Sequence, residues 1–283
     1  MASRTFITER QRRLGTELRR MRENCGLTIQ EAADRLGTNR SHVTNMELAR
    51  FGVSAERVRT LAALYDCPDT GYVDALAAMA GDRTRGWWEG YRGSIAAVGL
   101  DLAELEYHAT SLRVFVAMHV PGLLQTEQYA RAVLSETVPA RPMPELRRWL
   151  SHRMRRRDIL DRDDPPTCTF VIHEAALRLR FGTQEIMRTQ LQELVDSSRR
   201  RNVTVRVIPF SAGGFPVPGL TMTYASGAVP QLDTVQLDTA TTTEFLDAQT
   251  QLSNYRALME RITKTALPVK DSREFIRTLA DST

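Results

Sequence analysis

The sequence predicts two domains: an all-α domain of five helices, followed by a larger mixed α+β domain. Apolar residues recur at helical spacing through residues 9–80, whereas β-branched and aromatic runs that end at Pro or Gly begin only after Trp87. Between these regions lies a small, charged segment, GDRTRG, which is typical of a linker. The predicted organisation is therefore a first domain at 1–80, a linker at 81–86 and a second domain at 87–283.

The first domain is predicted to contain five short helices in close succession between residues 9 and 80. Leu14, Leu18 and Met21 form an apolar stripe along the first helix, and Val58 and Leu61 lie on one face of the fourth. Stripes of this kind indicate amphipathic helices that pack around a small common core.

The stretch QEAADRLGTNRSHVTNME, residues 30–47, predicts two helices joined by a tight turn. Thr28 with Glu31 three residues later is the capping-box pattern that begins a helix. Gly37 stands where this helix must end, because the turn needs a backbone conformation that most side chains resist. Asn39 is a good cap for the second helix.

The spacing inside this stretch is specific. Small Ala33 is followed after four residues by Gly37, then after six more by Val43 and after three more by Met46. This pattern predicts a helix-turn-helix, in which the second helix crosses close over the first. The alternative is a plain helical hairpin in the accessory domain of an enzyme. We disfavour it because five helices of this order and length surround the motif.

Residues 10–80 resemble the phage-repressor-like (Xre-type) helix-turn-helix domains, whose third helix lies in the major groove of DNA. The resemblance implies that the base-reading residues are Arg40, Ser41, Thr44 and Asn45. The helical positions of Ser41, Thr44 and Asn45 agree, because they point away from the apolar face. Arg and Asn also pair well with guanine and adenine in the major groove.

A second group is expected to contact the DNA backbone: Thr28, Gln30, Asn39, His42 and Arg50. Where the family often has a phosphate-binding Gln, this chain has Ile29, so Gln30 is the expected substitute; His42 is either phosphate-facing or structural. Arg22 and Glu47 match a buried ion pair that joins the first helix to the third. The arginines of the first helix could add backbone contacts or form a solvated face, and both interpretations stay open: Arg10, Arg12, Arg13, Arg19 and Arg20.

The second domain is predicted to interleave helices and strands. The predicted helices are 101–111, 127–136, 144–162, 184–199 and 248–265, and the predicted strands are 113–120, 168–173, 203–209, 219–225 and 233–239. A domain of this length can support its own hydrophobic core.

Several of its segments follow one another in a family-like order: VPGLLQTEQYARAVL, RMRRRDIL, HEAALR, QLQEL and NVTVRVIPFSAG, within 120–213. The domain resembles the long C-terminal domain of antitoxin-like transcriptional regulators from high-GC bacteria, which also carry an Xre-type domain in front. This resemblance implies a small protein partner encoded by a neighbouring gene. Since a helix-turn-helix protein usually binds DNA as a dimer, we also expect a homodimer. Its subunit contacts should come mainly from the second domain.

Two features of the second domain invite binding hypotheses. The arginine-dense helix at 147–164 could face solvent, face another subunit or make a second DNA contact. A solvated or subunit-facing role is favoured, because aspartates balance much of its charge. A Gly/Pro-rich loop at 211–219 precedes an acidic strip that could receive a basic partner: Asp233, Asp238, Glu244 and Asp247. An ordinary solvated hairpin is the favoured interpretation for any one of these residues.

The composition and motifs argue against catalysis, cofactors and membranes. Three scattered cysteines form neither a disulfide framework nor a metal-ligand pattern, and no nucleophile, zinc or phosphate-binding motif is present. His173 and Glu174, as neighbours on a predicted strand, should point to opposite faces. The uncharged run at 207–232 contains four prolines and four glycines, which a bilayer would not accommodate. We therefore expect a cytoplasmic, nucleoid-associated protein without metal or cofactor.

Arginine accounts for 36 of the 38 basic residues, a bias that composition alone cannot assign to a function. The favoured hypothesis is a DNA-binding regulator controlled by a small protein partner. A regulator that senses a small molecule is the alternative, and an enzyme with an accessory helix-turn-helix is disfavoured. The sequence distinguishes poorly between the protein-controlled and the small-molecule-sensing regulator. A groove for a protein and a pocket for a small ligand are both lined by apolar residues with a few polar groups.

Overall fold

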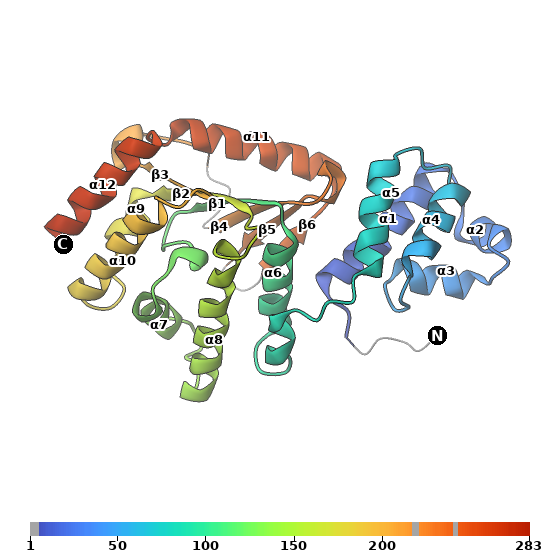
Figure 1. The fold of residues 1–283 in the computed structure, drawn as a ribbon, viewed down its shortest axis with the longest axis horizontal. Helices are drawn as coiled ribbons and strands as arrows, with labels where there is room; N and C mark the ends of the chain where they lie inside the picture. The colour runs from blue at the N-terminus through green and yellow to red at the C-terminus, as the bar shows by residue number, and fades with distance from the viewer. Residues whose placement is uncertain (1–5, 217–220, 240–242) are drawn as a thin grey trace. The chain divides into compact units, whose positions relative to one another are not determined.

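The computed structural model describes residues 6–216, 221–239 and 243–283 (Figure 1). It divides into two compact units, one that ends at Trp87 and one that begins at Trp88, and each is considered by itself. Parts of the predicted loop at 211–219 and of the predicted strand at 219–225 lie outside the described residues. Within the described ranges, every helix is too short or too polar to cross a membrane.

The first unit consists of five helices, as predicted: α1 (Glu9–Asn24), α2 (Ile29–Arg35), α3 (Arg40–Glu47), α4 (Ala55–Leu64) and α5 (Thr70–Gly81). A polar side chain caps the N-terminus of each one by accepting a backbone N–H: Thr8, Thr28, Asn39, Ser54 and Asp69. These caps satisfy N–H groups that have no partner inside the helix, and so fix where each short helix starts.

The core of the first unit forms where the apolar stripes meet. Leu18, Val43, Val58 and Leu61 are almost completely buried. Gly15 on α1 sets how closely α1 approaches α3, because a Cβ atom there would lie 2.3 Å from the carbonyl oxygen of Glu47. The helix that carries the predicted base-reading residues is therefore held backbone to backbone against α1.

The second unit is a mixed α+β domain, also as predicted. Its six-stranded sheet has the order β3-β2-β1-β4-β5-β6, in which the first three strands are parallel and β4, β5 and β6 pair antiparallel. The strands are β1 (Ser111–Val116), β2 (Thr167–His173), β3 (Val203–Ile208), β4 (Thr221–Ser226), β5 (Thr234–Asp238) and β6 (Thr243–Leu246).

Helices cover both faces of this sheet (Figure 1). They are α6 (Ala97–His108), α7 (Glu127–Ser135), α8 (Met143–Arg156), α9 (Glu174–Arg178), α10 (Gln184–Ser197), α11 (Gln249–Thr265) and α12 (Val269–Ser282). Short 3-10 turns connect them: Trp87–Tyr91, Gly122–Leu124, Arg157–Leu160, Phe210–Ala212 and Pro230–Leu232. One core packs α9, α10 and α12 against the parallel strands, and the other packs α11 against the opposite face.

The structure differs from the predicted elements in several places. Helices α9 and α12 and strand β6 were not predicted, and the predicted helix 144–162 ends at Arg156 before a 3-10 turn. His173 and Glu174 are not neighbours within a strand: β2 ends at His173, whose ring caps α9, and Glu174 begins that helix. Glu174 is buried and accepts the backbone N–H of Phe210 at 2.7 Å, which gives it a structural role.

Candidate DNA-binding surface

Local hydrogen bonds build the turn between α2 and α3. At Gly37 the backbone takes a φ of +60°, and the N–H of Thr38 donates to the carbonyl of Ala33 at 2.9 Å. Asn39 then begins α3, since its side chain accepts the N–H of His42 at 2.9 Å. Ala33 is completely buried, which lets the two helices pack closely.

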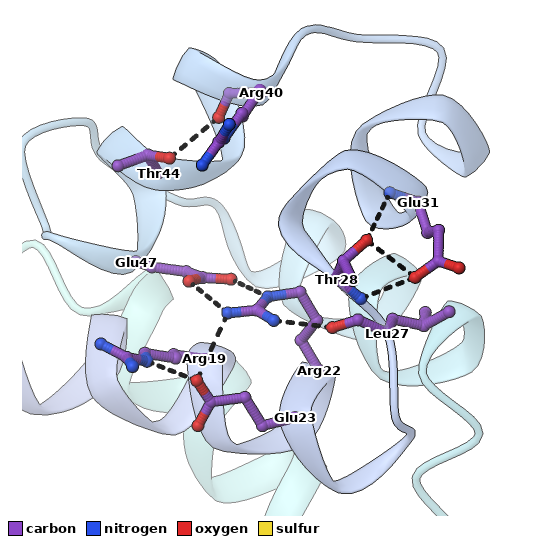
Figure 2. Close-up of polar contacts among 9 residues, drawn as sticks. All are labelled: Arg19, Arg22, Glu23, Leu27, Thr28, Glu31, Arg40, Thr44 and Glu47. Carbon is purple, nitrogen blue, oxygen red and sulfur yellow. Dashed lines mark hydrogen bonds and ion pairs between the residues drawn. The ribbon is translucent and has the colours of Figure 1, made fainter.

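The predicted base-reading residues all keep exposed surface on α3. Arg40 and Ser41 are exposed, and Thr44 and Asn45 are half-buried, whereas Val43 and Met46 of the same helix are buried. The hydroxyl of Thr44 donates to the carbonyl of Arg40 at 3.0 Å (Figure 2). The four residues thus remain accessible to a ligand, with Arg40 at the start of the helix and the other three along it.

The only carboxylate of α3 is neutralised inside the unit. Arg22 donates to both oxygens of Glu47, at 2.6 and 3.0 Å, and to the carbonyl of Leu27 at 2.7 Å (Figure 2). Both side chains are less than a tenth exposed, and the hydrogen bond to Glu47 raises the pKa of Arg22. An anionic ligand that approaches the exposed side of α3 therefore meets Arg40 without an uncompensated acid on the same helix.

Among the residues predicted to contact phosphates, Arg50 has the most available donors. It is exposed, and no ion pair with it occurs in the described part of the chain. His42 is half-buried, and its ring lies 5.5 Å from that of Phe51, whose N–H donates to the carbonyl of Asn45. His42 thus has a packing role beside its predicted contact.

Thr28 and Gln30 already have carboxylate partners. The N–H and the hydroxyl of Thr28 donate to Glu31 at 2.8 and 2.7 Å, and these bonds lower the pKa of Glu31 (Figure 2). The amide of Gln30 donates to Asp34 at 2.8 Å. A phosphate would have to compete with both acids, so the structure favours Arg50 over this pair.

The five arginines of α1 other than Arg22 all have acidic partners. Arg13 pairs with Glu17 at 2.6 Å and Arg19 with Glu23 at 2.7 Å. The remaining three pairs are Arg10 with Asp82, Arg12 with Glu9, and Arg20 with Glu17. The pairing disfavours backbone contacts by these arginines. A solvated, charge-balanced face describes Arg12 and Arg19, whereas Arg13 is buried with Glu17.

Sequence reasoning missed Glu17, a carboxylate that is only 2% exposed. Besides the arginines, it accepts the hydroxyl of Tyr72 on α5 at 2.5 Å, and burial raises the pKa of that hydroxyl. This contact joins α1 to α5. The one sequence signal for this burial is the position of Glu17 on the same side of α1 as Leu14 and Leu18.

Two arginines at the end of α8 and in the turn after it bind groups inside the second unit. Arg156 donates twice to Glu106, at 2.7 and 2.5 Å. Arg157 donates to the carbonyl of Gln125 and to Glu193, at 2.9 and 2.5 Å. These two residues depart from the predicted solvated or subunit-facing helix, because carboxylates and a carbonyl from other elements of the same unit accept their hydrogen bonds. Three arginines of α8 are exposed: Arg147, Arg148 and Arg155.

The predicted acidic strip is not one surface. Asp233 is 5% exposed and accepts the hydroxyl of Tyr224, the N–H of Gly227 and a guanidinium N–H of Arg256, at 2.7, 3.0 and 3.0 Å. Its prediction as a partner contact is wrong, because these donors hold it inside the fold. Asp238 and Asp247 are half-buried, and Glu244 alone is exposed. Across the described ranges, no group of His, Cys, Asp and Glu is arranged to hold a metal ion.

Comparison with known families agrees with the division of the chain into a helical first unit and a larger second unit. A family model for the domain of unknown function DUF5753 matches residues 100–278, and one described as a helix-turn-helix domain matches residues 13–71. No curated protein and no solved structure matches the chain. The helix-turn-helix match suggests a DNA-binding regulator.

Proposed function

The chain belongs to the DUF5753 family and carries a helix-turn-helix domain before the family region, and from this premise we propose that it is a sequence-specific transcriptional regulator. The observation that carries the proposal is the exposed side of α3. Arg40 and Ser41 project from its start, and the acid at its end is neutralised by Arg22. A guanidinium in this position suits the paired acceptors of guanine in the major groove.

The test uses the full chain and a preferred DNA site selected from a random duplex library. Arg40→Ala should weaken binding to that site by about 1–3 kcal/mol and relax the preference at one base pair. The matched control is Arg59→Ala, which removes another exposed arginine, on α4, that is paired with Asp74. Unchanged affinity and unchanged base preference for Arg40→Ala would refute the assignment of α3.

We further propose that the regulator acts as a homodimer, in the Xre-type manner, in the cytoplasm. Two recognition helices about 34 Å apart on one face of DNA need a second copy of the chain, and the larger unit offers most of the surface for that contact. Light scattering of the full chain should give the mass of a dimer, and the selected site should contain two related half-sites. A monomer that binds a single half-site would contradict the proposal.

For the second unit we propose a regulatory rather than a catalytic role. Its resemblance to antitoxin-like regulators supports binding of a small protein encoded nearby, with Asp238, Glu244 and Asp247 as the remaining acidic contacts. Co-purification of the full chain from its native lysate tests this, because a stoichiometric small protein with DNA enriched near its gene is expected. DNA enrichment without such a protein would favour a regulator that senses a small molecule.

A further inference from the structure

Helices α7 and α8 lie side by side in the second unit and share a small apolar core of their own (Figure 1). A groove of about 550 Å³ is lined by residues of both helices. On the α8 side these residues recur at helical spacing, and the last of them lies in the turn after the helix. From the first to the last, this stripe is roughly 16 Å long, or three helical turns. We call it the α8 stripe, and its members are Arg147, Leu150, Ser151, Met154, Arg155 and Asp158.

The two ends of the α8 stripe carry opposite charges. Arg147 at one end and Asp158 at the other are both exposed, and neither forms an ion pair in the described part of the chain. The opposite wall of the groove adds no net charge, because Glu127 and Arg131 of α7 pair with each other at 3.0 Å. The stripe therefore presents a cation at one end and an anion at the other to a second molecule.

A stripe with this charge order is complementary to an antiparallel copy of itself. In a two-fold symmetric contact, residue i of one copy meets residue j of the other, and j meets i. When two α8 stripes pack antiparallel around the middle of the stripe, Arg147 of each copy lies opposite Asp158 of the other. The same ion pair then forms twice, once at each end of the contact.

The residues between the charged ends also match in this arrangement. Ser151 falls opposite Met154, so that a small side chain faces a larger one at the centre of the contact. Met154 is half-buried and retains apolar surface, and a flexible methionine adapts well to an irregular groove. Leu150 falls opposite Arg155, whose aliphatic chain covers an apolar neighbour while its guanidinium stays in water. Size, apolar surface and charge therefore all agree with one register.

Other occupants fit the groove less well. The DNA backbone carries only negative charge, so Asp158 would repel it at one end of the stripe. A partner surface of one sign, acidic or basic, satisfies either Arg147 or Asp158 and opposes the other. A second copy of the chain satisfies both ends at once.

We propose that the α8 stripe is the dimer contact of the second unit, where it packs antiparallel against the same stripe of a second copy of the chain. This inference rests on the homodimer proposed above, and it names the residues that hold the two copies together.

The experiment reverses each charge in the full chain and measures self-association by sedimentation equilibrium. Arg147→Glu places like charges together at both ends of the contact, and so does Asp158→Arg. Each variant should weaken the dimer by roughly a hundredfold, because two attractive contacts become repulsive. The matched control is Arg148→Glu, which makes the same charge change at an exposed position of α8 that does not line the groove. It should dimerise like the unchanged chain.

A mixture of the two variants tests the register itself. A heterodimer of Arg147→Glu with Asp158→Arg has an attractive pair at both ends, so an equimolar mixture should recover a dimer within about tenfold of the unchanged chain. Native mass spectrometry, with one variant labelled with heavy nitrogen, should show mainly the heterodimer. If either variant fails to fold by circular dichroism, the double variant decides the question, because it should pair with itself and not with the unchanged chain.

The proposal is overturned if either single variant dimerises like Arg148→Glu, if the folded mixture stays monomeric, or if the double variant pairs freely with the unchanged chain. A dimer that persists in the single variants removes only this surface, whereas a monomeric unchanged chain removes the homodimer as well. DNA reading is separable from both. Monomeric Arg147→Glu should bind a duplex with a single half-site as the unchanged chain does, because Arg40 is untouched.

Discussion

Helices α3 and α8 use arginine in opposite ways. Helix α3 has a single arginine, Arg40, which is exposed and is followed by the exposed Arg50 just beyond the helix. Helix α8 is far richer in arginine, yet Arg156 is bound to Glu106, and Arg157 after the helix is bound to Glu193. Arg156 and Arg157 are thus engaged inside the fold, so the number of arginines in a segment overstates the guanidinium donors that it can offer to a nucleic acid.

The same comparison separates two kinds of ion pair. Arg22–Glu47 and Arg156–Glu106 are both buried and bidentate, and each joins elements distant in the sequence. The pairs within α1 are mostly more exposed and join residues three or four positions apart. Exposed pairs contribute little to stability, whereas breaking a buried one leaves an uncompensated charge.

The largest expected effect comes from breaking the two buried pairs separately. Glu47→Ala should lower the free energy of unfolding of the first unit by about 3–5 kcal/mol, and Glu106→Ala should do the same for the second. Hydrogen exchange with mass spectrometry would locate each loss. Asp74→Ala, at the exposed Arg59–Asp74 pair of the first unit, is the control and should cost less than about 1 kcal/mol. If either buried-pair variant loosened both units equally, the two units would be energetically coupled.

A smaller effect should follow from the close approach of α1 to α3. In Gly15→Ala the new Cβ would collide with the carbonyl of Glu47, which is backbone and cannot rotate away. We expect a loss of about 1–3 kcal/mol in the first unit, with a parallel loss of DNA affinity. Gly71→Ala is the matched control, because its new Cβ would meet only Asp69 at an ordinary 3.5 Å and Ala favours helix. Thermal unfolding should move in opposite directions in the two variants.

Most of the first unit could be predicted from the sequence, because residues close together in the sequence determine where its helices begin and end. Caps such as Thr28 and Asn39 are identified by their neighbours, and the turn at Gly37 by one residue type. The same local logic overlooked α12, although Ser272, Ile276 and Leu279 lie at helical spacing. The ion pair between Arg22 of α1 and Glu47 of α3 was predicted from the family resemblance, and local spacing alone does not indicate it.

The second unit resisted prediction because its polar contacts join distant segments. No spacing rule connects Arg156 to Glu106 or Arg157 to Glu193, and the sequence around Asp233 gives no sign of the donors that bury it. Acidic residues close in sequence were grouped as one surface, but strand alternation and the turn after β4 send them to different environments. The polar pairs Thr223–Gln236 and Thr221–Asp238 likewise emerge only from the register of β4 with β5.

The smallest expected effect tests the comparison of α3 with α8 most directly. Arg50→Ala should weaken binding to every DNA sequence about equally, and should reduce the slope of log K against log salt by about 1, because one phosphate contact is lost. Arg148→Ala removes an exposed arginine from the far more basic helix α8 and should leave both the affinity and the slope unchanged. Fluorescence anisotropy over a range of salt concentrations measures both quantities. An equal loss of slope in the two variants would mean that α8 also contacts phosphates, and that available arginines in the second unit extend the DNA-binding surface.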